Sequence, residues 1–316
     1  MSAAGTDRLD LIGVGQCSID HVCSVEGIPS LGGKAAMLAY EVLPGGQVAT
    51  AALAATRLGL RAAYVGTLGS DPQAEIAVAA LAAAGVDLDG VRRIPGASTR
   101  LAVILVDRAS GERTILGYRD PRLRLQPDEV PCARIASARC LLVDAEDPAA
   151  SLRAARAARE AGVPVVADLD TLSEAALTLL PLIDFPLVSR AFAEQLGMDG
   201  RVRSGLRRLV ETGARMAVVT LGDRGCLAQA GDREIVGPGF SIAPRDTTGA
   251  GDVFHAGFVA GLLDGVADAE LLRFANAAAA LSCRALGAQG GLPTRAEVDA
   301  FLVHDEPAPW RDPDAR

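Results

Sequence analysis

Short apolar runs alternate with helical segments along most of this 316-residue chain. Residues 9–14 have the composition of a buried strand, 46–58 form a helical segment, and 62–66 resemble the next strand. The same order recurs further on, with a strand at 140–143, a helix at 148–161, and strands at 164–167, 187–188 and 215–220. Strands that alternate with helices in this way form parallel sheets that are covered on both faces. The sequence therefore predicts an α/β fold, with a doubly wound, mostly parallel sheet flanked by helices.

Two regions interrupt this alternation. Residues 20–44 contain several Gly and Pro and no convincing helix, and residues 98–118 have the pattern of a β-hairpin with its turn at 107–111. Both regions adjoin strands of the main sheet, so we expect them to form a small β-sheet lid over its edge. The predicted organisation is a single domain over 8–303, a lid formed by about 18–45 and 97–120, and a disordered tail at 304–316.

The charge balance limits the partners. Asp and Glu (39) outnumber Lys and Arg (31), which gives a formal net charge of −8. This balance argues against nucleic-acid binding, because phosphate backbones require clustered basic residues. No apolar run reaches the length of a membrane span or a signal peptide. The six cysteines show no Cys-x-x-Cys spacing and fit a reducing compartment. We therefore expect a soluble, cytoplasmic protein with no nucleic-acid or membrane partner.

The segment Asp246-Thr-Thr-Gly-Ala-Gly-Asp252 is the most informative in the chain, and an apolar helix follows it. A glycine-rich turn that leads into a helix N-terminus presents free backbone N–H groups and the positive end of the helix dipole, which suits a phosphoryl group. Gly249 and Gly251 allow close approach of the backbone. Asp252, in the first helical turn, could accept a proton from an attacking hydroxyl, and we expect the helix N-terminus to keep it ionised. The alternative is that Asp252 only caps the helix.

Residues 246–259 resemble the second signature of the ribokinase-like (PfkB) carbohydrate kinase family. The similarity extends over about 9–303 and includes Gly45-Gly46 and the segments 219–222 and 288–293. The resemblance implies an ATP-dependent phosphotransferase with an alcohol acceptor, a single doubly wound domain with a β lid, ATP as donor and Mg²⁺ as the required ion.

The resemblance also implies roles for individual residues. Asp252 would be the catalytic base, and an anion hole would be formed by Gly249, Ala250 and Gly251. The nucleotide would lie near Thr220, Gly222, Asn276 and Ser189. A monovalent cation such as K⁺ would bind near Asp246 and Thr248. On its Ala-rich helix, Asn276 could equally be a core amide with satisfied hydrogen bonds.

Acceptor residues are predicted at the ends of strands. Asp20 follows the first strand and Glu146 follows the strand 140–143, and doubly wound sheets bind ligands at the carboxyl ends of their strands. The resemblance adds Gly45 and Gly46 to the acceptor site. Further acceptor candidates are Thr50, where the family usually has Asn, and Lys34, which could bind an anionic group or be an exposed lid charge.

The metal site departs from the family pattern. The family's Asn-x-x-Glu motif, which is tied to metal and phosphate binding, is replaced here by Ser189-Arg-Ala-Phe192. Glu194 is the substitute Mg²⁺ ligand that the sequence offers.

Within the family, the chain most resembles the branch that contains sulfofructose kinase, through the segments 33–34, 49–51, 168–170 and 252–255. That branch has an Arg about where Glu146 stands. A carboxylate there would repel a sulfonate or phosphate, so we expect a neutral sugar or polyol as acceptor. The alternatives are a nucleoside or an anionic sugar as acceptor, or a non-catalytic sugar-sensing protein. By analogy with the family, a homodimer would form through the lid.

Two other nucleotide-binding classes fit less well. A dinucleotide-binding oxidoreductase is suggested by Gly13-Val-Gly15, but no helix follows to hold a pyrophosphate. A Walker-type NTPase is excluded, because the segment 33–35 lacks the required hydroxyl residue and Ile28 stands where the first Gly is needed.

Overall fold

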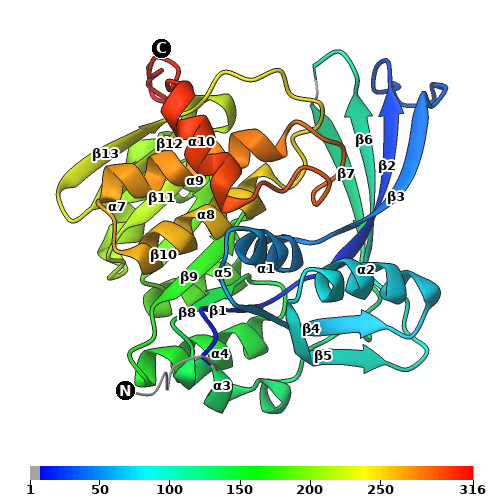
Figure 1. The fold of residues 1–316 in the computed structure, drawn as a ribbon, viewed down its shortest axis with the longest axis horizontal. Coiled ribbons are helices and arrows are strands. Elements are labelled where there is room, and N and C mark those ends of the chain that lie inside the picture. Colours follow the sequence, from blue (N-terminus) through cyan, green and yellow to red (C-terminus); the bar gives the residue numbers. More distant parts are fainter. Residues whose placement is uncertain (1–7, 111, 316) are drawn as a thin grey trace.

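The computed structural model describes residues 8–110 and 112–315, and two β-sheets form its frame (Figure 1). The main sheet has nine strands in the order β13-β12-β11-β10-β9-β8-β1-β4-β5. These strands are β1 (Leu11–Val14), β4 (Ala62–Gly69), β5 (Asp87–Ile94), β8 (Cys140–Val143), β9 (Val165–Leu169), β10 (Phe185–Ser189), β11 (Ala217–Thr220), β12 (Gly225–Ala230) and β13 (Arg233–Pro238). All neighbours pair in parallel except β11–β12 and β12–β13, which are antiparallel. The predicted mostly parallel sheet is confirmed.

Helices cover both faces of this sheet (Figure 1). One layer contains α1 (Gln47–Arg57), α2 (Pro72–Ala83), α8 (Ala250–Asp264), α9 (Asp268–Ser282) and α10 (Arg295–His304). The other layer contains α3 (Cys132–Ser137), α4 (Pro148–Glu160), α5 (Glu174–Leu179), α6 (Arg190–Gly197) and α7 (Val202–Glu211). Short 3₁₀ turns lie at η1 (Pro127–Glu129), η2 (Leu180–Leu182) and η3 (Gly222–Arg224).

The two apolar cores follow from the alternation of side chains along each strand. In β8, Cys140 and Leu142 point into the core on the α8 side, whereas Leu141 and Val143 point into the core on the α4 side. A strand that is buried on both faces must be apolar throughout, which explains the continuous apolar runs in the sequence. Small residues allow the helices to pack closely: a Cβ added to Gly257 of α8 would lie 2.8 Å from the Cα of Ala275 in α9.

The second sheet is the predicted lid. It has the strand order β3-β2-β6-β7 and stands beside the main sheet (Figure 1). Its strands are β2 (Ser18–Val25), β3 (Ala39–Gly45), β6 (Leu101–Asp107) and β7 (Arg113–Tyr118). The predicted hairpin is the antiparallel pair β6–β7, and residue 111 of its turn lies outside the described residues. Val22, Ile104 and Val106 are buried and pack against Leu43 and Leu286, which fixes the lid to the body of the protein.

The main sheet changes its direction of winding between β1 and β8. The chain runs from β1 outward to β4 and β5 and then returns to form β8 on the other side of β1. In doubly wound sheets, ligands bind at the carboxyl ends of strands beside such a switch point. The fold therefore places the candidate site at the carboxyl ends of β1, β8 and β9.

The end of the chain differs from the prediction of a disordered tail. Trp310 packs against the core on the α4 side, and the Ala308 N–H donates to the Gly239 carbonyl at 2.7 Å. The Asp314 carboxylate accepts from the N–H groups of Val202 and Arg203 at 2.8 and 3.1 Å. These are the first residues of α7, where no local side chain caps the helix. The tail is ordered because it supplies the missing cap and covers apolar surface.

Among the described residues, no helix combines the length and apolar character needed to cross a membrane.

Candidate active site

The glycine turn before α8 has the backbone geometry that the sequence predicts. Gly249 is the N-cap residue with φ of 78°, in the left-handed region that favours glycine. A Cβ there would lie 2.7 Å from the Cα of Ala288, so the turn is also too close to its neighbour for a side chain. Gly251 is exposed, and a Cβ added to it would meet nothing within 4 Å. The first turn of α8 is therefore open to an anion.

Asp246 holds this turn in place. Its Oδ1 accepts from the Thr248 N–H at 2.9 Å and from the Thr248 hydroxyl at 2.7 Å. Its Oδ2 accepts from the Gly287 N–H at 2.8 Å. Both Asp246 and Thr248 are buried. These contacts fix the turn, and the predicted monovalent-cation role of the two residues stays a prediction.

Asp252 lies half-buried in the first turn of α8, next to the open turn. Burial, and then the negative charges of Asp168 and Asp20, raise the pKa of Asp252 well above its ordinary value. This differs from the expectation that the helix N-terminus keeps Asp252 ionised. The helix dipole acts on one side of the carboxyl group, whereas the fold surrounds it with carboxylates from β2 and β9.

Asp20 of β2 is buried beside the end of β3. The Ser18 hydroxyl donates to its Oδ1 at 2.8 Å, and burial raises the pKa of Asp20 to about 6. A Cβ at Gly45 would lie 2.1 Å from Asp20 Oδ2, so the carboxylate packs directly on the glycine. Gly46 has φ of 94° and ends this strand at the start of α1. The structure thus brings the predicted acceptor residues Asp20, Gly45 and Gly46 together.

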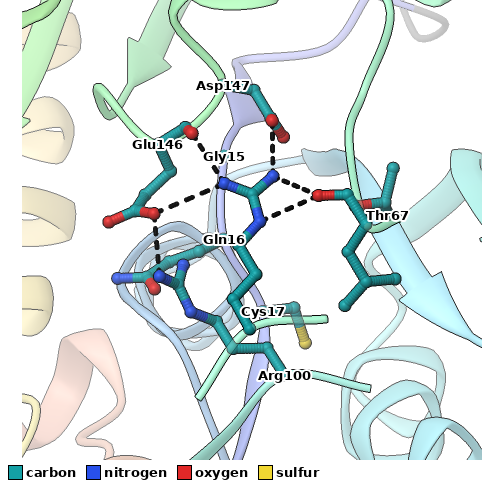
Figure 2. A pocket seen from close by; sticks show the side chains of 9 residues that line it. Gly15, Gln16, Cys17, Thr67, Arg100, Glu146 and Asp147 are labelled. Atoms are coloured by element: carbon teal, nitrogen blue, oxygen red, sulfur yellow. Dashed lines mark hydrogen bonds and ion pairs between the residues drawn. The ribbon is translucent and has the colours of Figure 1, made fainter. Parts of the chain in front are cut away.

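Glu146 lines a small open cavity at the switch point (Figure 2). The Arg100 guanidinium contacts the Glu146 carboxylate at 2.8 Å, and Arg119 lies 3.6 Å from it. Arg119 also pairs with Asp147 at 2.5 Å. Asp252 is not among the residues that line this cavity.

The floor of the cavity is fixed by Asp144, which follows β8. Its carboxylate accepts from the N–H groups of Gln16 and Glu146 at 2.7 and 3.0 Å. This links the carboxyl ends of β1 and β8 across the switch point. Asp144 is 1% exposed, and burial raises its pKa to about 7.

Of the residues predicted to lie near the nucleotide, some stand at the carboxyl edge of the main sheet and one is buried in the core. Thr220 ends β11 and Gly222, with φ of 62°, begins η3, both at the carboxyl edge of the main sheet. Ser189 caps α6, accepting from the Phe192 N–H at 3.1 Å. Asn276 is buried and donates to the Gly237 carbonyl at 2.9 Å. Its amide therefore links α9 to β13, which fits the alternative that Asn276 is a core amide with satisfied hydrogen bonds.

The predicted Mg²⁺ ligand and two predicted acceptor residues have the following surroundings. Glu194 is bound to Arg190 one helical turn away, at 2.5 Å. Lys34 lies in the exposed part of the chain between β2 and β3. Thr50 is buried in α1, and its hydroxyl accepts from the Gln289 side chain at 3.2 Å.

The sequence predicted lid contacts to the acceptor from Tyr118, Arg119 or Arg113 without ranking them, and it gave no role to Asp168, Asp170 and His255, which the fold gathers here. Asp168 lies near the carboxyl end of β9 and Asp170 directly follows this strand, and His255 lies one turn beyond Asp252 on α8. Arg113 of the lid reaches the glycine turn, where its Nη1 donates to the Thr247 hydroxyl at 2.8 Å. The sequence did offer one signal for His255, because it is a polar residue in a mostly apolar helix. The position of Arg113 depends on how the lid docks on the main sheet.

Comparisons with known proteins identify the family of this chain. Residues 9–295 match the pfkB family carbohydrate kinase description. The chain belongs to the pfkB family of carbohydrate kinases. It is 31% identical to the ribokinase of Haemophilus influenzae, over 94% of this chain and 99% of that protein. It is 34% identical to fructokinase-1 of Zea mays, over 94% of this chain and 98% of that protein.

The fold of a pfkB kinase is also seen in the solved structures. Ribokinase of Arabidopsis thaliana, in complex with ribose and ATP, aligns with a TM-score of 0.81 at 26% identity and covers 93% of this chain and 99% of its own. Ribokinase of Thermotoga maritima aligns with a TM-score of 0.80, also at 26% identity, and covers 94% of this chain and 100% of its own. The prediction of an ATP-dependent sugar kinase is confirmed, and the resemblance to the sulfofructose kinase branch stays a prediction.

Proposed function

We propose that this pfkB kinase transfers the γ-phosphoryl group of ATP to a hydroxyl of a small neutral sugar or polyol, with Asp252 as the base. The observation that carries the proposal is the place of Asp252. It stands in the first turn of α8, directly after the open glycine turn, and it is within electrostatic reach of the acceptor residue Asp20.

In the proposed step, the acceptor oxygen attacks the γ-phosphorus while the bond from that phosphorus to the bridging oxygen of ADP breaks. The hydroxyl proton passes to Asp252 Oδ. The N–H groups at Gly249, Ala250 and Gly251 hold the charge on the transferred group. The raised pKa makes Asp252 a stronger base than an exposed aspartate, which suits proton transfer from an alcohol.

We place the adenine nucleotide along the carboxyl ends of β10 and β11, near Ser189, Thr220 and Gly222. Mg²⁺ would neutralise the phosphate charge. It prefers oxygen ligands and keeps several waters, so it needs few protein ligands. Glu194, the predicted substitute for the carboxylate of the family motif, is paired with Arg190, and we therefore assign Mg²⁺ chiefly to the phosphates and water.

The charges around the acceptor favour a neutral molecule. Arg100 and Arg119 are balanced by Glu146 and Asp147, which they contact. Apart from these pairs, the charged side chains that shift the pKa of Asp252 are mostly acidic. Among the described residues, Arg113 adds one positive charge there, but three carboxylates outnumber it, so an anionic sugar would be repelled.

A coupled assay of ADP release over a panel of sugars, polyols and nucleosides tests the proposal. We expect turnover of a neutral sugar such as ribose or fructose. Asp252→Asn should keep nucleotide binding and lose about 10²–10⁴ in kcat, the usual contribution of a general base. Asp264→Asn, at the other end of the same helix, is the matched control. Turnover of a phosphorylated or sulfonated sugar far above that of ribose and fructose would contradict the neutral acceptor.

We further propose that the lid pairs with the lid of a second copy. Tyr40, Leu116 and Tyr118 are 52%, 60% and 52% exposed, and strand register places them on one face of the lid. Val103 and Leu105, partly buried, lie between them on the same face. An apolar face of this kind suits a self-complementary interface. Analytical ultracentrifugation should show a dimer that Leu116→Asp dissociates; a monomeric wild type would contradict the proposal.

We infer a cytoplasmic location. All six cysteines are free, and five of them are buried. Free thiols in such number suit a reducing compartment. Fractionation of cells that produce the protein at its native level tests the assignment.

A further inference from the structure

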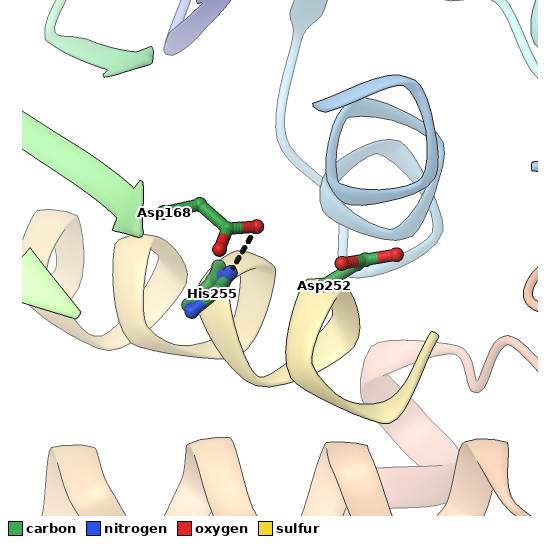
Figure 3. A group of neighbouring side chains, drawn as sticks. All are labelled: Asp168, Asp252 and His255. Atoms are coloured by element: carbon green, nitrogen blue, oxygen red, sulfur yellow. Dashed lines mark ion pairs between the residues drawn. The ribbon is translucent and has the colours of Figure 1, made fainter. Parts of the chain in front are cut away.

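Asp252 belongs to a second group of side chains besides the proposed phosphoryl-transfer site. Asp168 stands at the carboxyl end of β9, and His255 lies one turn after Asp252 on α8 (Figure 3). One donor atom from each of the three side chains lies within 4.8 Å of the others. Asp168 and His255 are 5% and 4% exposed, so this group is shielded on one side and opens on the side of Asp252.

Two buried atoms in this group lack hydrogen-bond partners. Asp168 Oδ2 and His255 Nδ1 lie 3.0 Å apart and form an ion pair only when His255 is protonated (Figure 3). Neither atom makes a hydrogen bond of good geometry among the described residues. The other oxygen of Asp168 accepts from the Gln47 side chain at 3.2 Å, which holds the carboxylate in place. Buried nitrogen and oxygen atoms are nearly always satisfied. With a neutral imidazole the ion pair is absent, and a cation between the two atoms would satisfy both.

The separation of these atoms fits two ligands of one cation. Ligand atoms at about 2.1 Å from a metal ion lie about 3.0 Å apart at the roughly 90° angle of octahedral coordination and about 3.4 Å apart at the tetrahedral angle that Zn²⁺ prefers. Asp252 offers a carboxylate oxygen within 4.8 Å of one donor atom of each of the other two residues, and opposite ligands of an octahedral ion lie about 4.2 Å apart. Rotation of the half-buried Asp252 side chain closes this difference.

We propose that Asp168, Asp252 and His255 form a binding site for a divalent transition ion of the Zn²⁺ class. One imidazole nitrogen and two carboxylate oxygens suit Zn²⁺, Co²⁺ or Mn²⁺, whereas Mg²⁺ and Ca²⁺ prefer oxygen ligands throughout. Three protein ligands leave further positions for water on the open side. The site is separate from any Mg²⁺ that accompanies the nucleotide.

Occupancy of this site inhibits the kinase, a consequence that rests on the proposed role of Asp252. A carboxylate lone pair that is bound to a metal ion is withdrawn from the acceptor hydroxyl. The ion therefore competes with proton transfer, and its effect depends on His255 and Asp168, which the proposed transfer step does not use.

Binding is tested on the full-length protein without a histidine tag, nucleotide or sugar. We expect Co²⁺ to give visible d–d absorption that saturates at one equivalent, and calorimetry to show Zn²⁺ binding with the same stoichiometry. Loss of an outer-sphere partner alone costs 10–100-fold in metal affinity, so His255→Ala and Asp168→Asn should each cost about 100-fold or more. The exposed His304→Ala is the matched control and should bind as the wild type does. Asp168→Asn keeps the side-chain shape, and circular dichroism confirms the fold of each variant.

Wild-type-like Co²⁺ spectra and affinity in folded Asp168→Asn and His255→Ala would overturn the site, as would displacement of Co²⁺ by equimolar Mg²⁺. The inhibition is measured separately, as the Zn²⁺ concentration that halves each variant's own rate. Zn²⁺ binding that leaves turnover unchanged would keep the metal site and refute Asp252 as the base. The two proposals can therefore fail independently.

Discussion

The contact between Gly45 and Asp20 gives the sharpest test of the acceptor site. A Cβ at Gly45 would lie 2.1 Å from Asp20 Oδ2, whereas ordinary contacts begin near 3.4 Å. The carboxylate must therefore retreat by more than about 1 Å, because the surrounding core is close-packed and the strand cannot move freely. A displacement of about 1 Å at a positioning group costs about 100-fold in rate, or about 2.7 kcal/mol of transition-state stabilisation.

We expect Gly45→Ala to lower kcat/KM for the sugar about 100-fold and to leave the affinity for the nucleotide unchanged. ADP release at varied sugar concentration and calorimetric titration with nucleotide measure the two quantities. Gly27→Ala is the control, because a Cβ there meets nothing within 4 Å. In an Asp20→Ala background, the Gly45 substitution should add little further loss, since its clashing partner is gone. A Gly45→Ala enzyme as active as the control, or an equal loss in both backgrounds, would refute the reasoning.

Three further outcomes follow from particular contacts. Arg113→Ala removes the hydrogen bond from the lid to the glycine turn and should lower kcat about 10- to 100-fold. Arg108→Ala, at an exposed position of the same hairpin, should leave kcat unchanged. Equal kcat values for the two variants would contradict a role for the lid contact. The Asp144 pKa of about 7 exceeds the value of 3.8 in an unfolded chain, so the folded protein holds a proton that the unfolded chain releases between these pH values. Urea unfolding should therefore show a free energy of unfolding that falls by a few kcal/mol as the pH rises from about 4 to about 7, at about 1.4 kcal/mol per pH unit. Asp144→Asn should flatten this slope. A free energy of unfolding that rises over this range would be inconsistent with the buried carboxyl. Asp314→Ala removes the cap of α7 and should cost about 1 kcal/mol in thermal unfolding, in contrast to the exposed Glu306→Ala; no difference between them would mean that the tail does not cap the helix.

Local pattern in the sequence was enough for the fold class and for the backbone geometry of the glycine turn. Continuous apolar strands such as 140–143 are buried on both faces, and only parallel sheets between helices bury strands in this way. The glycine turn before Asp252 lies within seven consecutive residues, so its geometry depends on local backbone preferences that the sequence displays directly. Asp20 and Glu146 were predicted as acceptor residues because each was expected to follow a strand; Glu146 does follow β8, whereas Asp20 lies within β2 of the lid.

The tertiary structure decided which distant groups share a neighbourhood. Asp168 and His255 are far apart in the sequence, and only the packing of α8 against β9 brings an oxygen of Asp168 to 3.0 Å from a ring nitrogen of His255. The pairing of Glu146 with Arg100 likewise depends on the docking of the lid. The pKa of Asp252 was misjudged because the helix dipole is a local property, whereas the burial and the surrounding carboxylates that raise it come from other parts of the chain. Electrostatic energies depend on distances and burial in space, and a sequence pattern gives neither for groups that are far apart along the chain.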